Sequence, residues 1–236
     1  MFHRRMLGYL KEQNWFAVIV EFLIVVLGVF LGIQASNWNE ARAEQRLGEA
    51  YLDGFRADLL ADSRMLTEEI EGRRAQSQDA LAVLEFYDGR ELEPALFFEA
   101  FYSALYSRQT QPNRNTMDEV LNAGALHLIE DDDVRLGLLD LQATYRNIEA
   151  SEEHLSRDFD QYLYDPTFSS IPVQIAGPWQ DTPALRRDAQ ALLDDTRIEN
   201  GLRLVVANLQ LPGGIEDELE VAKAQVDDLL RRIPEG

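Results

Sequence analysis

Four consecutive acidic residues form the group in this sequence that most resembles a metal site. The run comprises Glu130, Asp131, Asp132 and Asp133, and hard divalent cations prefer carboxylate oxygens as ligands. The run lacks the spacing of a calcium-binding loop, and acidic residues also cap and stabilise the N-termini of helices. We therefore interpret Asp131 as the N-cap of a helix and predict no metal site.

The sequence shows no arrangement typical of an enzyme. His127 and His154 are the histidines outside the first fourteen residues, and neither has a nucleophile or a second ligand at a recognisable spacing. H-E-x-x-H, G-x-S-x-G and phosphate-loop motifs are absent from the sequence. The chain has no cysteine, which excludes disulfides, thiol catalysis and cysteine-ligated metals. We predict that the protein is not an enzyme and binds no cofactor.

Arg114, Asn115 and Thr116 form the one candidate site for a small ligand or anion. The stretch from Thr116 to Glu119 matches a capping box, T-x-x-E, which predicts the start of a helix. Free amides and an arginine would converge at that helix N-terminus, where anions bind. We favour a plain loop and helix cap here and keep the anion site as the alternative.

The element that we expect to position the rest is an apolar run near the N-terminus. Residues 15–33 contain fourteen Leu, Ile, Val or Phe residues and one charged residue, Glu21. A helix of that length roughly matches the hydrocarbon core of a bilayer, about 30 Å. The apolar residues favour insertion by about 4–8 kcal/mol, whereas Glu21 opposes it by at most about 3 kcal/mol. Trp15 and Trp38 flank the run as membrane-interface anchors, so we predict a transmembrane helix over 15–36.

One face of this predicted helix carries small and polar residues. Glu21, Gly28, Gly32 and Ala35 fall close to one line along the helix. The spacing of Gly28 and Gly32 lets two helix backbones approach closely, and a carboxylate in lipid tends to turn toward protein. We predict that this face mediates self-association or docking to another membrane helix. The alternatives are a chance G-x-x-x-G, with Glu21 reaching toward the headgroups, or proton transfer by Glu21 with partner helices.

The flanks of the run predict its orientation and argue against cleavage. The apolar region of a cleaved signal peptide is usually shorter than this one, and Ile33 is a poor partner for cleavage after Ala35. Cytoplasmic flanks are enriched in basic residues, which favours a cytoplasmic N-terminal flank, residues 1–14. The basic residues are Arg4, Arg5 and Lys11 before the run, and Arg42 and Arg46 after it.

The remaining chain, 37–236, is acidic and predicts an all-α domain. The sequence contains 42 acidic and 22 basic residues, a formal net charge of −20, which should repel nucleic acid and anionic lipid. We expect the transmembrane helix to continue into an antiparallel helical bundle with a small helical insert. The predicted segments are a long helix over 37–87, an insert over 94–129, a helix over 131–165, an irregular loop over 166–181, and helices over 182–210 and 215–233.

Several of these boundaries follow from local signals. The helix over 131–165 shows apolar residues at alternating spacings of four and three, typical of a bundle seam, with Glu152 filling one gap. We expect Asp165-Pro166 to end it. Thr182-Pro183 predicts the next start, as N-cap and first helical residue. That helix could bend or break near Asn200-Gly201, and we expect an extended segment over 173–175.

Residues 34–40 read Q-A-S-N-W-N-E, and residues 116–129 read T-M-D-E-V-L-N-A-G-A-L-H-L-I. With these two segments the chain resembles a bacterial family of single-pass membrane proteins known only as a domain of unknown function. Met117 stands where that family has an aromatic residue, and Ala123 where it has serine. The resemblance covers the anchor and roughly the next hundred residues. It implies an envelope protein with an extracytoplasmic helical domain and brings no known activity.

Together these patterns predict a non-enzymatic protein anchored in the bacterial inner membrane, with its C-terminal domain in the periplasm. We expect a structural or protein-interaction role, with the lipid bilayer, a second copy or partner membrane helix, and an envelope protein as partners. The alternative is an extracytoplasmic sensor that binds a small ligand and works with a membrane partner. A sealed helical core would favour the first function, and a well-formed pocket near Arg114 and the aromatic helix would favour the second.

Overall fold

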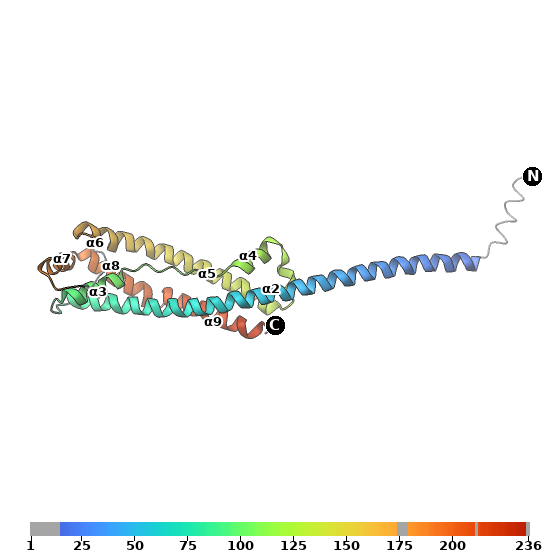
Figure 1. The fold of residues 1–236 in the computed structure, drawn as a ribbon, viewed down its shortest axis with the longest axis horizontal. Coiled ribbons are helices and arrows are strands. Elements are labelled where there is room, and N and C mark those ends of the chain that lie inside the picture. Colours follow the sequence, from blue (N-terminus) through green and yellow to red (C-terminus); the bar gives the residue numbers. More distant parts are fainter. Residues whose placement is uncertain (1–14, 174–178, 211, 235–236) are drawn as a thin grey trace, which may run out of the picture. The chain divides into compact units, whose positions relative to one another are not determined.

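The computed structural model of this chain describes residues 15–173, 179–210 and 212–234, and all regular structure in these ranges is helical (Figure 1). The predicted all-α class is thereby confirmed. Two compact units, Met1–Ala50 and Tyr51–Gly236, are distinguished, and each is described by itself. The flank predicted for residues 1–14 lies outside the described residues.

Helix α2, Trp15–Tyr87, contains 73 residues. The first proline of the sequence is Pro94, so no residue before it removes a helical hydrogen bond. In the first unit the described apolar side chains of α2 are exposed. This helix is long and apolar enough to cross a membrane, which confirms the predicted long apolar helix at the N-terminal end.

The second unit begins within α2. Its described residues contain nine further helical elements, of which one is a short 3₁₀ helix. A 3₁₀ helix and a π-helical segment are labelled η1 and η2. The elements are α3 Pro94–Ala104, α4 Asn115–Asn122, η1 Ala125–Leu128, α5 Asp132–Phe159, η2 Asp160–Tyr164, α6 Asp165–Ser170, α7 Pro183–Leu193, α8 Thr196–Gln210 and α9 Ile215–Arg232.

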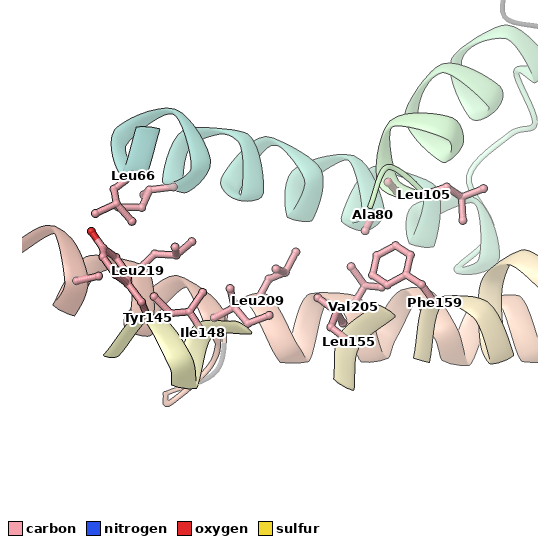
Figure 2. Packing of buried hydrophobic residues seen from close by; sticks show 14 of the residues in the cluster. Leu66, Ala80, Leu105, Tyr145, Ile148, Leu155, Phe159, Val205, Leu209 and Leu219 are labelled. Carbon is pink, nitrogen blue, oxygen red and sulfur yellow. The ribbon is translucent and has the colours of Figure 1, made fainter. Parts of the chain in front are cut away.

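The most extensive helix contact in the second unit joins α5 to α9. Residues spaced alternately by four and three share one face of a helix, and the predicted seam of α5 is buried from Val134 to Phe159. Figure 2 shows Tyr145 and Ile148 of α5 near Leu219 of α9, with Leu66 of α2 close by. The buried residues of α9 are Ile215, Leu219, Ala222, Val226 and Leu229.

Two predicted helix caps are confirmed by their hydrogen bonds. Asp131 accepts from the backbone amides of Asp133 and Val134 at 2.9 and 3.0 Å, so this acid satisfies free amides at the start of α5. Thr182 accepts from the Leu185 amide at 3.1 Å, and Pro183 opens α7. Both caps use contacts within three residues, which explains why the local sequence was sufficient to predict them.

The structure corrects the prediction that Asp165-Pro166 ends a helix and that 166–181 is irregular throughout. After α5 the chain forms the π-helical segment η2 and then helix α6. Pro166 lies in the first turn of α6, where its missing N–H costs little. The wider π turn also shifts the buried face. The spacing of four and three along α5 would continue from Phe159 to Tyr162, whereas Leu163 is buried and Tyr162 is only partly buried. Most of the extended segment expected at 173–175 lies outside the described residues.

The predicted helix over 182–210 is two helices, and the break lies at Asp194-Asp195 rather than near Asn200-Gly201. Gly201 is buried inside α8, and a Cβ atom there would lie 2.9 Å from the Tyr162 carbonyl oxygen. Contacts that close are sterically forbidden, so the glycine allows α8 and η2 to approach rather than interrupting α8. Asp195 accepts from the Arg197 amide at 3.0 Å at the start of the second helix.

Candidate functional site

Five buried polar side chains of the second unit gather at one segment without helical structure, residues 105–114, which we call the strap. They are Asp62, Arg73, Gln76, Thr110 and Glu152. The strap connects α3 to α4 and runs beside α2 and α5 (Figure 1). Arg108 pairs with Glu69 of α2, with nitrogen–oxygen distances of 3.1 and 3.2 Å. Thr110 bonds to Glu152 of α5. The strap therefore occupies the space between these two helices.

Two glycines of α2 make room for Arg108 of the strap and for Thr116, which follows the strap in α4. An added Cβ at Gly72 would meet the Arg108 guanidinium, and one at Gly54 would lie 2.9 Å from the Thr116 hydroxyl oxygen. These glycines are about 27 Å apart along a helix, and the chain from Arg108 to Thr116 covers about the same distance only when extended. The strap is thus nearly extended and antiparallel to α2.

Glu152 holds the centre of the strap through a buried ion pair. Its carboxylate accepts from the Thr110 amide at 3.0 Å and from the Thr110 hydroxyl at 2.6 Å. It also accepts from Arg73 of α2, which is 1% exposed and donates to the Arg108 carbonyl at 3.3 Å. Burial lowers the pKa of Arg73, and the charges of Glu152 and Glu69 oppose that shift.

Asp62 of α2 holds the strap closer to α4. Its carboxylate accepts from the Asn113 amide at 2.8 Å and from the Tyr145 hydroxyl at 2.7 Å. Burial raises the pKa of Asp62, although both hydrogen bonds favour the charged form. The Tyr145 pKa is raised by burial and by the neighbouring Asp62 charge. This site joins α2, α5 and the strap through one carboxylate.

The start of the strap is held through its carbonyl groups. Gln76 of α2 donates to the Ala104 and Tyr106 carbonyls at 3.0 and 2.8 Å. The Tyr164 hydroxyl donates to the Leu105 carbonyl at 2.6 Å, and burial raises the pKa of this tyrosine. Side chains of three separate elements therefore supply the hydrogen bonds that an extended segment cannot make within itself.

The predicted anion site at Arg114, Asn115 and Thr116 is built differently from the expectation. Helix α4 has Arg114 rather than Thr116 at its N-cap position, so the capping-box prediction is wrong. The Thr116 amide donates to Asp58 at 3.0 Å, the Asn115 amide faces Asn113 Oδ1 at 3.4 Å, and Arg114 pairs with Glu149 at 2.7 Å. The chain's own carboxylates thus occupy the donors that a bound anion would need.

The pocket beside Asp62 is small. The pocket beside Asp62, Asn113 and Tyr145 has a volume of about 20 Å³, which holds about one water molecule. The aromatic face of α3 is covered by Trp179, whose ring stacks on Tyr102 and Phe98 with centroid distances of 5.2 and 5.3 Å. These contacts cover part of the aromatic face. Open surface grooves remain beside Tyr102 and Tyr106, about 290 Å³, and beside Thr110 and Glu152, about 390 Å³.

The acidic run and the histidines form no metal site in the described parts of the chain. No group of three or more His, Asp or Glu side chains there is arranged to hold a metal ion. Asp133 of the run pairs with Arg232 at 3.0 Å. His127 lies 3.0 Å from the Gly124 carbonyl, and His154 lies 3.8 Å from Asp158. Asp133, His127 and His154 therefore each contact another residue of the fold.

The predicted membrane-facing residues are all exposed on the first unit. Glu21, Gly28, Gly32 and Ala35 are exposed on α2, and no described atom lies within 4 Å of a Cβ added at either glycine. Trp15 and Trp38 are 65% and 60% exposed. These residues of α2 are exposed in the described chain, which leaves this part of the helix available to lipid or to another helix.

Sequence reasoning missed the groups that hold the strap, chiefly Asp62, Arg73, Gln76 and Thr110. Three of these residues, Asp62, Arg73 and Gln76, could have been noticed in the sequence, because they interrupt the apolar spacing of α2. Apolar residues with helical spacing occur at Leu59, Leu66 and Ile70 and then again only at Leu81 and Leu84. Leu81 is exposed, whereas Asp62, Arg73 and Gln76 are buried.

Comparison with protein-family models, with curated proteins and with solved structures gave no match.

Proposed function

We propose that this protein is a non-enzymatic membrane anchor protein of the bacterial envelope. Residues 15–36 span the inner membrane with the N-terminus in the cytoplasm, and 37–236 form an antiparallel helical bundle in the periplasm. The exposed apolar surface of α2 supports membrane insertion, since water would disfavour it strongly. The bundle serves a structural or protein-interaction role.

The observation that carries the non-enzymatic part of this proposal is the internal use of the buried charges. Asp62 and Glu152 accept hydrogen bonds from the strap backbone, and the pocket beside Asp62 has a volume of about 20 Å³. Glu152 borders an open groove of about 390 Å³ but is itself only 8% exposed. A catalytic or ligand-binding carboxylate needs an open path to its substrate. Here the same groups instead close the space between α2 and α5.

Labelling of single cysteines tests the anchoring and the orientation, because the natural chain has none. Leu136→Cys introduces a thiol at a position that is 56% exposed, and His3→Cys introduces one in the N-terminal flank. With the outer membrane permeabilised, an impermeant maleimide should label Leu136→Cys in whole cells and His3→Cys only after lysis. The reverse pattern would overturn the orientation, and release of the chain by carbonate washing would overturn the anchor.

Self-association is proposed to use the face with Glu21, Gly28, Gly32 and Ala35. Gly28→Leu combined with Gly32→Leu should weaken dimerisation in a membrane two-hybrid assay of the full chain, because the added side chains keep the backbones apart. Val26→Leu with Phe30→Leu changes the opposite face and serves as the control. Equal dimerisation in both double variants would contradict a role for this face.

The alternative function, a small-ligand sensor working with a membrane partner, is favoured by one feature. A surface groove of about 290 Å³ lies between α2 and α3, and its lining includes Gly72, Tyr102, Tyr106 and Arg108. Arg108 is already paired with Glu69, so a ligand would have to compete with that carboxylate. Thermal stabilisation of the full chain by a periplasmic small-molecule extract, abolished by Tyr106→Ala, would support the sensor.

A further inference from the structure

Trp38, Arg42 and Arg46 form a stripe on the part of α2 that directly follows the apolar run. The Arg42 guanidinium lies over the Trp38 ring, with 4.6 Å between the guanidinium carbon and the ring centroid. The Arg46 Nε donates to the Arg42 carbonyl at 3.1 Å. Each arginine side chain therefore bends back by one helical turn toward the apolar run.

These two guanidinium groups lack a carboxylate partner among the residues that the structure describes. The only carboxylate one turn farther along from this stripe is Glu49, which accepts from Gln45 at 3.1 Å. In contrast, arginines of the second unit such as Arg74, Arg203 and Arg232 pair with acids. Arg64 of the second unit also bonds only to a backbone carbonyl, but Arg42 and Arg46 are adjacent on one face of α2 and lie next to an exposed tryptophan.

The position of the stripe matches the depth of lipid headgroups. Trp38 follows Ile33 by five residues, which is about 7.5 Å of helix, and a headgroup layer is about 5–8 Å thick on each side. The backbones of Arg42 and Arg46 lie beyond that layer. The Arg42 side chain reaches back to Trp38, whereas the Arg46 side chain reaches back only to the Arg42 carbonyl, so its charge lies just behind the layer. Guanidinium groups bind phosphate through paired N–H donors, and an indole ring is typical of this layer.

We propose that Trp38 and Arg42 bind the phosphate of an anionic phospholipid headgroup, with the charge of Arg46 one helical turn behind them adding to the attraction. The inference depends on the proposed membrane anchoring and adds a specific lipid site to it. The two guanidinium groups attract an anionic phosphate at short range, whereas Glu40 and Glu44 of the same stretch lie away from the stripe on the helix. A bound headgroup also fixes the depth at which α2 leaves the membrane.

Lipid retention by the full-length chain tests this site. The protein is purified in detergent, mixed with equal amounts of phosphatidylglycerol and phosphatidylcholine, and examined by native mass spectrometry. We expect the natural chain to retain phosphatidylglycerol preferentially. Each arginine should contribute about fivefold to that preference, so Arg42→Gln with Arg46→Gln should reduce it by about twenty-five-fold.

Arg64→Gln is the matched control. Arg64 lies on the same helix, its Nε donates to the Leu60 carbonyl at 3.1 Å, and the substitution removes one positive charge. It should leave the preference unchanged, whereas Arg46→Gln alone should lower it. An equal loss in the two single variants would show that only net charge matters and would overturn the site.

Two further arms separate the remaining outcomes. If inorganic phosphate displaces phosphatidylglycerol completely, the site binds free phosphate and the lipid assignment is wrong. If the natural chain stays in carbonate-washed membranes but shows no preference for phosphatidylglycerol, the headgroup site fails while the anchor stands. If the natural chain leaves the membrane on washing, the proposed anchoring itself fails.

Discussion

Helix α5 makes two long contacts, one with α9 and one with the strap, and different interactions stabilise them. Toward α9, Leu138, Tyr145 and Ile148 form an apolar seam with side chains such as Leu219 and Val226. Toward the strap, Glu152 and its partners form a buried polar contact with the backbone. A helix satisfies its own amides and carbonyls, whereas an extended segment inside a protein must obtain hydrogen bonds from its neighbours.

The difference explains why charged residues occupy core positions of α2 and α5. Glu152 and Asp62 lie at positions where an apolar residue would pack equally well against another helix, yet each accepts a strap amide. A buried ion pair contributes little net stability compared with apolar residues, but removing one partner is costly. The predictions below disturb first one contact and then the other.

The largest effect is expected for Glu152→Ala, because it leaves the buried Arg73 guanidinium and the Thr110 amide unpaired. The free energy of unfolding of the full chain in detergent should fall by about 3–5 kcal/mol. Glu153→Ala is the control, since Glu153 is exposed and lies 3.9 Å from Arg157, and it should change the value by about 0.5 kcal/mol or less. Chemical denaturation followed by circular dichroism measures both. Similar losses in the two variants would contradict the account of the strap.

Leu219→Ala should weaken the apolar seam by about 2–5 kcal/mol through lost burial and a cavity. Leu219 is fully buried on α9 and makes no polar contact with the strap. The same denaturation experiment measures the loss. Combined with Glu152→Ala, the two losses should add within about 0.5 kcal/mol, if the two contacts of α5 are independent. Strong coupling would mean that they form one contact.

The smallest effect is a change in pH dependence on replacing Asp62 with Asn. Burial raises the pKa of Asp62 above its ordinary value of 3.8, so the folded state binds this proton more readily than the unfolded state. The contribution of Asp62 is therefore most favourable below pH 3.8 and is lost as the pH rises through the raised pKa. The unfolding free energy of the natural chain minus that of Asp62→Asn should fall as the pH rises from about 4 to about 7. A difference that rises over this range would contradict the assignment.

How far the sequence could predict the structure depended on how local each signal was. The seams of α5 and α9 and the caps at Asp131 and Thr182 depend on residues a few positions apart, and the structure confirms them. The strap depends on pairs such as Arg73 with Glu152, which are 79 positions apart. The sequence showed only that Glu152 interrupts an apolar pattern, and not which group it would meet.

Glycine and proline gave the least reliable local signals, because their role depends on what packs beside them. Glycine lowers helix propensity, yet α2 continues through Gly54 and Gly72, and Thr116 and Arg108 fill the space that they leave. Pro166 was expected to end a helix, whereas the π turn of η2 leads into α6 at that residue. In each case a neighbour distant in sequence decides the outcome.

Hydrogen exchange of individual strap amides tests most directly the claim that buried carboxylates seal the space between α2 and α5. The Thr110, Asn113 and Thr116 amides donate to Glu152, Asp62 and Asp58, although Thr110 and Asn113 lie outside any helix. In the full chain in detergent, measured by mass spectrometry with residue-level fragmentation, these amides should exchange as slowly as those in the middle of α5. Exchange at the rate of an exposed turn amide would show that the strap is open and would contradict the account.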